Sequence, residues 1–388
     1  MSKSVRLGVI GVGGMGSHHA NQILQGNAAR IELTAVCDTD PEKLACFDKH
    51  PKVKQFGDSR KLIRSGLVDA VLVATPHYFH TTIGIDAMQQ GLHLLTEKPI
   101  SVHKADCERL IAAHKGRKRQ VFAAMFQMRT LAHYQKIKQL VASGELGRLT
   151  RMSWIITDWF RSDTYYASGG WRATWGGEGG GVLLNQCPHN LDLLQWILGM
   201  PSFVQAHCAL GRWHKIEVED DVNAYLEFPG GMTGVFITTT GEAPGTNRLE
   251  ICGERGKLVS EGNEIRYTRN EVSMIEFCRT TPHMFAVPPV WNVEVPVHGQ
   301  GGSHLDVLTN FADAILDGKP LIAPAEEGVR SVELANAMLF SSLQNKGVRL
   351  PLDGKAYERQ LKKLVAGSTQ TKKTVRKAKS VDMAASFK

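Results

Sequence analysis

A glycine motif near the N-terminus constrains the fold more than any other feature. Residues 11–16 read Gly-Val-Gly-Gly-Met-Gly, between an apolar segment typical of a strand (residues 5–10) and a segment compatible with a helix (residues 17–24). In such a unit the first glycine permits a tight turn, the second lets the backbone approach a pyrophosphate, and the third lets the helix pack on the strand. N–H groups at the start of the helix then bind the anion. The motif predicts a parallel sheet with a dinucleotide site at its edge.

An acidic residue after the second expected strand supports this interpretation. Asp38 follows residues 32–37, about twenty residues after the glycines, where a carboxylate accepts hydrogen bonds from ribose hydroxyls. The same carboxylate repels a 2′-phosphate, and no arginine stands in residues 39–41, so NAD is expected rather than NADP. A glycine turn of only structural use is the alternative, and the strand, the spacing and the acid argue together against it. The candidate cofactor residues of this region are Gly11, Gly13, Gly14, Met15, Gly16 and Asp38.

The apolar pattern divides the chain into two parts. In residues 1–124, short β-branched runs alternate with segments of helical period, which predicts βαβ units and a parallel sheet. The expected strands of this part are residues 5–10, 32–37, 70–74 and 93–95. Residues 125–353 instead indicate an α+β domain with an open, largely antiparallel sheet. Its expected strands are residues 148–157, 203–210, 223–228, 232–240 and 248–252, and its late helices are residues 304–316 and 326–343. The predicted fold class is therefore α/β, with two domains.

The net charge of +8 is concentrated at the C-terminal end. From residue 371 onward the chain carries six basic residues against one acid, Asp382. Residues 354–388 are therefore predicted to be a basic extension that is partly disordered. Recruitment to nucleic acid through this extension is the alternative, which truncation at Lys372 tests by the loss of salt-sensitive DNA retention. Because the rest of the chain is nearly neutral, nucleic acid is not an expected partner.

Composition and cysteine pattern exclude several classes of protein. Hydrophobic residues make up 43% and charged residues 22% of the chain, which excludes a wholly disordered, collagen-like or coiled-coil protein. No apolar stretch reaches the roughly 18 residues of a membrane helix, so a cytoplasmic protein without a membrane partner is expected. The seven cysteines are scattered without C-x-x-C pairs, which indicates reduced thiols rather than disulfides or a zinc ribbon.

Three further segments, together with the glycine motif, resemble the Gfo/Idh/MocA family of sugar and polyol oxidoreductases. They are Ala-Thr-Pro at residues 74–76 with His80, Glu-Lys-Pro at residues 97–99, and Gly-Gly-Gly at residues 179–181 leading into Asn-Gln-Cys-Pro-His-Asn-Leu-Asp at residues 185–192. The resemblance covers residues 5–353. It implies a Rossmann domain followed by a domain whose open sheet often forms the face of a homodimer or homotetramer. It also implies an NAD(P)-dependent enzyme that interconverts a secondary alcohol and a ketone on a sugar, glycoside or cyclic polyol such as inositol.

The resemblance assigns roles to individual residues. Lys98 matches the catalytic lysine of the family and His189 its catalytic histidine, while Thr75, Pro76, His80, Glu97 and Lys98 match positions that line the cofactor. The chemistry asks for the same residue types. When a hydride leaves an alcohol carbon, the hydroxyl proton must also leave and a developing alkoxide must be stabilised, so one base and one cation suffice. A histidine, with an ordinary pKa of about 6.5, is the readier base than a lysine near about 10.4.

Residue 185 departs from the family pattern. The position four residues before His189 is commonly an aspartate, and here it is Asn185. Asn185 is expected to cap a helix that runs to residue 198, with Pro188 in the first turn. An amide can orient a hydroxyl or a ring nitrogen, but it cannot raise the basicity of a histidine by charge. This departure favours His189 as the proton acceptor and leaves the division of work with Lys98 open.

The expected substrate region lies in the second domain. Four of the seven tryptophans fall between residues 154 and 175, beside a glycine-rich loop (residues 169–181), where they either pack in the core or face a sugar ring. The candidate substrate contacts are Arg129, Asp158, Trp171, Arg172, Asn185, His189 and Asp192. The pairs His189 with Asp192 and His77 with His80 lack a third ligand at recognisable spacing, so no metal is expected.

Two other functions remain open at this stage. One is an enzyme of the same fold that acts on a non-sugar substrate, such as a trans-dihydrodiol or a tetrapyrrole. The other is a non-catalytic NAD-binding sensor, although the presence of both Lys98 and His189 argues against it. The identity of the sugar or polyol depends on loop geometry that no spacing rule gives.

Overall fold

The N-terminal part of the chain forms the predicted parallel sheet. The computed structural model describes residues 4–368, and its first sheet has six strands in the order β3-β2-β1-β4-β5-β6, all pairs parallel. The strands are β1 (Val5–Ile10), β2 (Ile31–Cys37), β3 (Lys54–Phe56), β4 (Ala70–Val73), β5 (His93–Thr96) and β6 (Phe122–Ala124). This order is that of a doubly wound dinucleotide-binding sheet, so the predicted fold of this part is confirmed.

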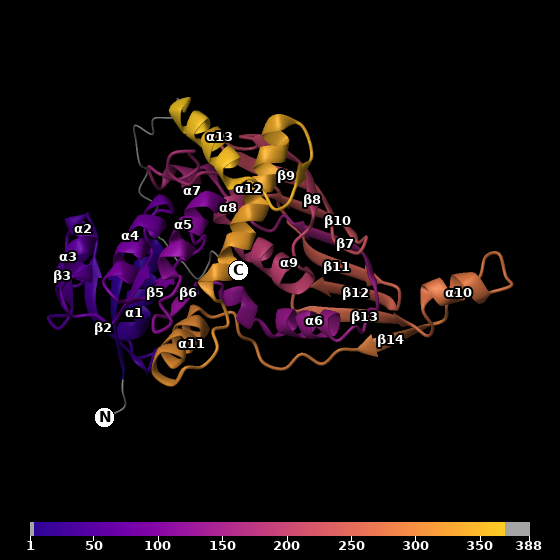
Figure 1. Cartoon of the computed structure of the whole chain (residues 1–388), viewed down its shortest axis with the longest axis horizontal. Coiled ribbons are helices and arrows are strands. Elements are labelled where there is room, and N and C mark those ends of the chain that lie inside the picture. Colours follow the sequence, from indigo (N-terminus) through magenta and orange to yellow (C-terminus); the bar gives the residue numbers. More distant parts are fainter. Residues whose placement is uncertain (1–3, 369–388) are drawn as a thin grey trace.

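Helices from both ends of the chain cover this sheet. Those from the N-terminal part are α1 (Gly14–Leu24), α2 (Pro41–Ala45), α3 (Ser59–Ile63), α4 (Tyr78–Gln89) and α5 (Lys104–His114). Helix α11 (His304–Asp317) returns to the same sheet, where Phe311 and Val307 share a core with Leu7 and Leu33 (Figure 1). A domain boundary at residue 124 therefore does not follow the packing, because the first core is completed by residues of the predicted second domain.

The second sheet is open and largely antiparallel, as predicted. Its nine strands lie in the order β14-β13-β12-β11-β7-β10-β9-β8-β15, and of its pairs only β7 with β10 is parallel. The strands are β7 (Leu149–Ile156), β8 (Phe203–Leu210), β9 (Glu219–Glu227), β10 (Thr233–Thr239), β11 (Asn247–Gly253), β12 (Gly256–Glu261), β13 (Glu264–Asn270), β14 (Val290–Glu294) and β15 (Val348–Arg349).

The two faces of this sheet differ. Trp154 and Phe236 point to the face covered by helices and are fully buried. Their neighbours on the other face, Tyr225 and Val235, are exposed, as alternation along a strand requires. The helices on the covered face are α6 (Ala132–Ala142), α9 (Pro188–Leu198) and α12 (Gly328–Gln344), and α12 runs between the two sheets in Figure 1.

Two parts of the chain differ from the prediction. Strands β12–β14 and helix α10 (Met274–Thr280) were not expected, and α10 projects beyond the far edge of the second sheet (Figure 1). The fold also does not end at residue 353. Helix α13 (Gly354–Ala366) begins at an Asp353 cap and buries Tyr357 and Leu361, so its amphipathic pattern belongs to the folded domain. The basic residues from Lys372 onward lie outside the described residues.

A search of residues 4–368 for a membrane span found no helix with the length and apolar character to cross a bilayer.

Candidate functional site

The glycine turn after β1 leaves space for a ligand. Gly11 has a φ of +88°, and a Cβ atom there would lie 2.8 Å from the carbonyl carbon of Ala74. A Cβ atom on Gly16 would lie 1.7 Å from the carbonyl oxygen of Gly11, so neither glycine can be replaced without a shift of backbone. A Cβ atom on Gly13 would meet nothing within 4 Å. Helix α1 begins at Gly14 without a side-chain cap, which leaves N–H groups of its first turn for an anion.

Asp38 lies beside this turn, at the end of β2. Its Oδ2 accepts a hydrogen bond from the N–H of Val12 at 3.0 Å, and its Oδ1 accepts one from the N–H of Asp40 at 3.0 Å. The Nζ atom of Lys43 lies 3.5 Å from Asp38 and 3.7 Å from Asp40. The carboxylate is thus held next to the glycines, where a ribose of a bound dinucleotide would reach it.

In the segment after β4, the hydroxyl of Thr75 lacks a hydrogen-bond partner in the part of the chain that the structure describes, whereas both ring nitrogens of His80 contact the main chain. The hydroxyl of Thr75 is buried and has no hydrogen-bond partner among residues 4–368, so it fits a ligand that approaches the end of β4. His80 behaves differently from the expectation that it contacts the cofactor. Its ring is fully buried, with each nitrogen 2.8 Å from a main-chain carbonyl, one of Thr75 and one of Pro99. His80 therefore links the segment after β4 to the segment after β5, and its ring nitrogens are not available to a ligand.

Glu97 forms a buried ion pair at the end of β5. Its Oε1 lies 2.6 Å from Nε2 of His19, which projects from helix α1. Burial opposes ionisation, but the hydrogen bond with His19 and the charges of His19, His304 and Lys98 together lower the pKa of Glu97 to about 2. Glu97 is therefore a fixed negative charge directly before Lys98.

Lys98 is held at the junction of the two domains. Its Nζ donates a hydrogen bond of 2.7 Å to the carbonyl oxygen of Asn185. Burial lowers the pKa of Lys98 below its ordinary value of 10.5. The charge of Glu97 opposes this shift, that of Arg172 adds to it, and that of Glu178 again opposes it.

His189 is the second residue of helix α9 and is buried. Its Nε2 lies 3.4 Å from the side-chain amide of Gln127, and its Nδ1 has no hydrogen-bond partner within the described part of the chain. Burial lowers the pKa of His189 well below 6.5, and the charge of Lys98 lowers it further. The ring is therefore neutral at physiological pH, and a neutral imidazole can accept a proton.

The predicted role of Asn185 as a helix cap is wrong. Asn185 ends a short helix, α8 (Val182–Asn185), and α9 begins only at Pro188, after Cys187. The helical conformation is interrupted between α8 and α9, so Asn185 does not share a helix face with His189. Its Nδ2 donates to Oε1 of Glu178, and its Oδ1 accepts a hydrogen bond from the hydroxyl of Tyr165 at 3.3 Å.

Arg129 and Asp192 pair with each other instead of lining an open pocket. Nε and Nη2 of Arg129 donate to the two carboxylate oxygens of Asp192 at 2.7 and 2.6 Å, and both side chains are 1% exposed. Nη1 of Arg129 donates to Glu327 at 2.6 Å, and Gln195 donates to Asp192 at 3.0 Å. These bonds use the polar atoms that a substrate would need, so this geometry argues against the expected substrate contacts. The group joins α9 to the 3-10 turns η1 (Gln127–Thr130) and η2 (Ala325–Glu327).

Tyr165, on helix α7 (Asp163–Ala167), is the centre of a polar cluster that includes Asn185, the residue whose carbonyl binds Lys98. Its hydroxyl accepts hydrogen bonds from Arg172 at 2.8 Å and Gln186 at 3.0 Å, and donates to Asn185. The guanidinium carbons of Arg172 and Arg161 lie 4.6 and 5.2 Å from the centre of its ring. These contacts join Tyr165, Arg172, Gln186 and Asn185 into one cluster, in which cations pack on an aromatic ring.

The remaining residues predicted around the substrate lie in different surroundings. Trp171 lies near the site, since its ring centre is 5.6 Å from that of His77, whose Nδ1 is 3.3 Å from the carbonyl of Glu178. Asp158 lies two residues after the end of β7 and is exposed. Trp154, by contrast, is fully buried in the core.

Sequence reasoning missed Tyr165, Glu178 and Gln127. Glu178 interrupts a run of glycines, and a single acid within a glycine loop is a signal that could have been used. Tyr165 and Gln127 carry no such signal, because their partners Arg172 and His189 lie in other elements.

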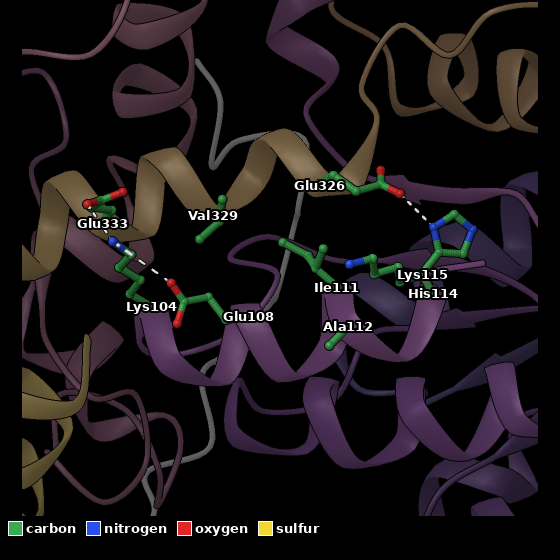
Figure 2. A pocket seen from close by; sticks show the side chains of 9 residues that line it. All are labelled: Lys104, Glu108, Ile111, Ala112, His114, Lys115, Glu326, Val329 and Glu333. Carbon is green, nitrogen blue, oxygen red and sulfur yellow. Dashed lines mark hydrogen bonds and ion pairs between the residues drawn. The ribbon is translucent and has the colours of Figure 1, made fainter. Parts of the chain in front are cut away.

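A hollow on the surface lies away from these residues. Figure 2 shows a groove between helices α5 and α12 whose charges are largely paired, Lys104 with Glu333 at 2.9 Å and His114 with Glu326 at 2.6 Å. None of the predicted site residues lines it. Among the described residues, no group of three or more histidine, cysteine or acidic side chains is arranged to hold a metal ion.

Two family models match the chain. Residues 5–125 match a family described as oxidoreductase family, NAD-binding Rossmann fold. Residues 134–259 match the model described as GFO/IDH/MocA C-terminal domain.

Individual relatives agree with these matches. The chain is 29% identical over 265 residues to 1-carboxy-3-chloro-3,4-dihydroxycyclo hexa-1,5-diene dehydrogenase of Comamonas testosteroni, a match that covers 68% of this chain and 64% of that protein. It is 24% identical over 352 residues to myo-inositol 2-dehydrogenase of Thermotoga maritima, covering 89% of this chain and 98% of that protein. The solved structure of the WlbA dehydrogenase of Bordetella pertussis, in complex with NADH and UDP-GlcNAcA, is 25% identical, with a TM-score of 0.76 over 90% of this chain and 100% of that one.

Proposed function

Since the chain belongs to the Gfo/Idh/MocA oxidoreductase family, we propose that it is an NAD-dependent dehydrogenase that interconverts a secondary alcohol and a ketone on a sugar, glycoside or cyclic polyol. The observation that carries the proposal is the pairing of a neutral, buried His189 with a cationic Lys98 at one junction. The names of the relatives support the substrate class, because one is a myo-inositol dehydrogenase and another was crystallised with a nucleotide sugar acid.

The residues divide the chemistry between them. A bound NAD supplies the hydride acceptor, and Gly11, Gly13 and Asp38 would hold it. His189 is neutral, and its unprotonated ring nitrogen takes the proton of the substrate hydroxyl. Lys98 donates a hydrogen bond to the same oxygen as negative charge develops there, and the carbonyl of Asn185 keeps its ammonium in place. Because both groups are preorganised and enclosed, little solvent must reorganise during the step.

We propose NAD rather than NADP as the preferred cofactor. Two carboxylates, Asp38 and Asp40, face the region of the adenine ribose, against one lysine, Lys43. A 2′-phosphate would meet a net negative charge there. NADH should therefore bind more tightly than NADPH when energy transfer from tryptophan is titrated, and Asp38→Ser should narrow the difference.

We propose that the protein acts as a homodimer or homotetramer through the second sheet. Its uncovered face exposes Tyr225 (40%) and Val235 (39%), and the segment after α10 exposes Met284 (89%) and Phe285 (92%). Apolar side chains exposed over a flat sheet are typical of surfaces covered by another subunit. Light scattering during size exclusion should give a multiple of 42.7 kDa, and Val235→Lys should lower that multiple. A monomeric wild-type protein contradicts the proposal.

A cytoplasmic location is also proposed. All seven cysteines are free thiols in the structure, which suits a reducing compartment.

A panel of substrates tests the activity. NADH formation is followed by fluorescence with NAD and, separately, NADP, against inositols, hexoses, their acids and glycosides. We expect turnover with one ring polyol or sugar, lost in His189→Ala while NADH still binds. No turnover across the panel, with NADH binding intact, contradicts the proposal and favours a sensor.

One other substrate class is favoured by a specific observation. The Comamonas relative is named as a dehydrogenase of a dihydroxycyclohexadiene, which is a ring diol but not a sugar. A cyclohexadiene diol therefore belongs in the same panel, and its turnover without that of sugars assigns the chain to that class.

A further inference from the structure

Glu178 is a buried carboxylate that the mechanism above does not use. It stands in the glycine-rich loop and is 1% exposed. Its Oε2 accepts a hydrogen bond of 2.5 Å from the N–H of Ala173, and its Oε1 accepts one from the side-chain amide of Asn185. Nη1 of Arg172 lies 4.0 Å away. Burying a carboxylate costs free energy, so a carboxylate buried in this way indicates a structural or functional role.

The loop is built around this carboxylate. Ala173, which donates to it, has a φ of +52°, a backbone conformation that is costly for a residue with a side chain. A Cβ atom on Gly177 would lie 1.9 Å from the carbonyl oxygen of Trp171, and one on Gly179, whose φ is +75°, would lie 2.0 Å from Val102. The backbone therefore turns so tightly that only glycine fits at two positions flanking Glu178.

Asn185 connects Glu178 to Lys98. Its side chain donates to Glu178, while its carbonyl oxygen accepts the ammonium of Lys98 at 2.7 Å. A single residue thus separates a buried anion from the cation at the reaction centre. Asn185 itself is neutral, so it can transmit orientation but supplies no charge. The carboxylate of Glu97 is the other anion near Lys98, and it already pairs with His19 at 2.6 Å.

We propose that Glu178 is a positioning residue for Lys98: its carboxylate fixes the amide of Asn185, and its charge keeps the ammonium protonated at working pH. The proposal rests on the proposed function, in which Lys98 binds the substrate oxygen. In agreement, burial lowers the pKa of Lys98, and the charges of Glu97 and, to a smaller extent, Glu178 oppose that shift. The other charged or titratable groups around Glu178 are Arg172, His77, Tyr165, Tyr166 and Glu219.

Removing the carboxylate from residue 178, and then placing one on its hydrogen-bond partner, residue 185, tests the proposal. Glu178→Gln removes the charge at nearly constant shape. Its kcat should fall by about 10- to 100-fold, and the basic limb of its pH–kcat profile should shift to lower pH, because Lys98 loses its proton more easily. Glu178→Gln with Asn185→Asp restores a carboxylate beside Lys98, so kcat and the basic limb should recover. A uniform loss at every pH, with no recovery in the double variant, overturns the proposal.

A measurement on Lys98 itself separates this inference from the proposed function. In protein with ¹³C-labelled lysine, the Lys98 signal is assigned by its loss in Lys98→Met and titrated without substrate. The midpoint should fall in Glu178→Gln, whether or not any substrate is turned over. An unmoved midpoint overturns the proposal even if a substrate is found, and a failed substrate panel with a shifted midpoint contradicts only the proposed function.

A neighbouring acid provides the matched control. Glu219 is also fully buried and accepts hydrogen bonds from the N–H groups of Gly181 and Leu183, in the same glycine segment, at 2.8 and 3.0 Å. Glu219→Gln should loosen this segment and leave the Lys98 midpoint unchanged. Where Glu178→Gln fails to fold by thermal unfolding, Asn185→Asp serves instead: an added carboxylate should raise the Lys98 midpoint, and a fixed or lowered midpoint contradicts the proposal.

Discussion

Two buried charge networks lie along helix α9, and they are built differently. The open network, at the N-terminal end of the helix, consists of Lys98, Asn185, Glu178 and the nearby His189. The closed network, in its middle, consists of Arg129, Asp192, Glu327 and Gln195. In the closed network the guanidinium of Arg129 donates from all three of its nitrogens. In the open network Nδ1 of His189 has no partner among the described residues.

The difference suggests a rule for separating support from chemistry. A buried cation whose donors are all satisfied by the protein holds elements together and has nothing left for a ligand. A buried group with an unused polar atom costs stability unless something else binds it. We therefore expect substitutions in the open network to change turnover more than stability, and substitutions in the closed network to do the reverse.

The largest effect should follow Lys98→Met. The variant removes the cation that binds the developing alkoxide, so kcat should fall by about 10³- to 10⁴-fold, or roughly 4–5 kcal/mol of transition-state stabilisation. Stability should not fall, because a partly desolvated charge has been replaced by an apolar chain of similar length. Turnover is measured by NADH formation and stability by thermal unfolding. A strongly destabilised variant that keeps its turnover would reverse the assignment of the two networks.

Arg129→Met should produce the largest loss of stability. It leaves Asp192 buried without its cation, and the free energy of unfolding should fall by about 3–5 kcal/mol in denaturant titrations. The double variant Arg129→Met with Asp192→Asn removes the stranded charge and should recover part of the loss. Turnover per folded molecule should stay within a few-fold of wild type. Loss of turnover at unchanged stability would instead favour a substrate contact for Arg129.

The open network was the more predictable of the two from sequence. Its residues Lys98 and His189, like Gly11 and Asp38 of the cofactor turn, stand at strand or helix ends within short motifs, where chain neighbours largely define their surroundings. Arg129 has no such neighbours. Its partner Glu327 is 198 residues away, so an arginine that is fully paired in the fold reads in sequence like one that awaits a substrate.

Local signals failed where two structures suited the same residues. Asn185 is a good cap residue, but Pro188 starts a helix equally well and moves the first turn of α9 two residues onward. The basic charge of the C-terminal end predicts that residues 354–366 lie outside the fold, but Tyr357 and Leu361 give them a buried face. In both places tertiary packing decided between local alternatives.

The pH dependence of the reaction should sharpen the description of the open network. His189 must be neutral to accept a proton, and burial lowers its pKa well below 6.5, so kcat/KM should fall only as the pH drops below that value. Lys98 must be charged, and burial lowers its pKa below 10.5, so activity should fall as the pH rises, before that value is reached. Each limb should change about tenfold per pH unit. An acid limb centred above pH 6.5 would contradict the neutral, buried state of His189.

The smallest effect should come from removing one hydroxyl that contacts Asn185 of the open network. Tyr165→Phe removes the oxygen that joins Arg172, Gln186 and Asn185, and should cost about 1–2 kcal/mol in kcat/KM for the substrate. The adjacent Tyr166 is the control, because its hydroxyl pairs with the hydroxyl of Thr240 at 2.7 Å. Tyr166→Phe should cost about 1 kcal/mol of stability and leave kcat/KM unchanged. Equal effects of the two variants on kcat/KM would mean that Tyr165 serves the core, like Tyr166, and that the substrate contacts must be sought in other residues.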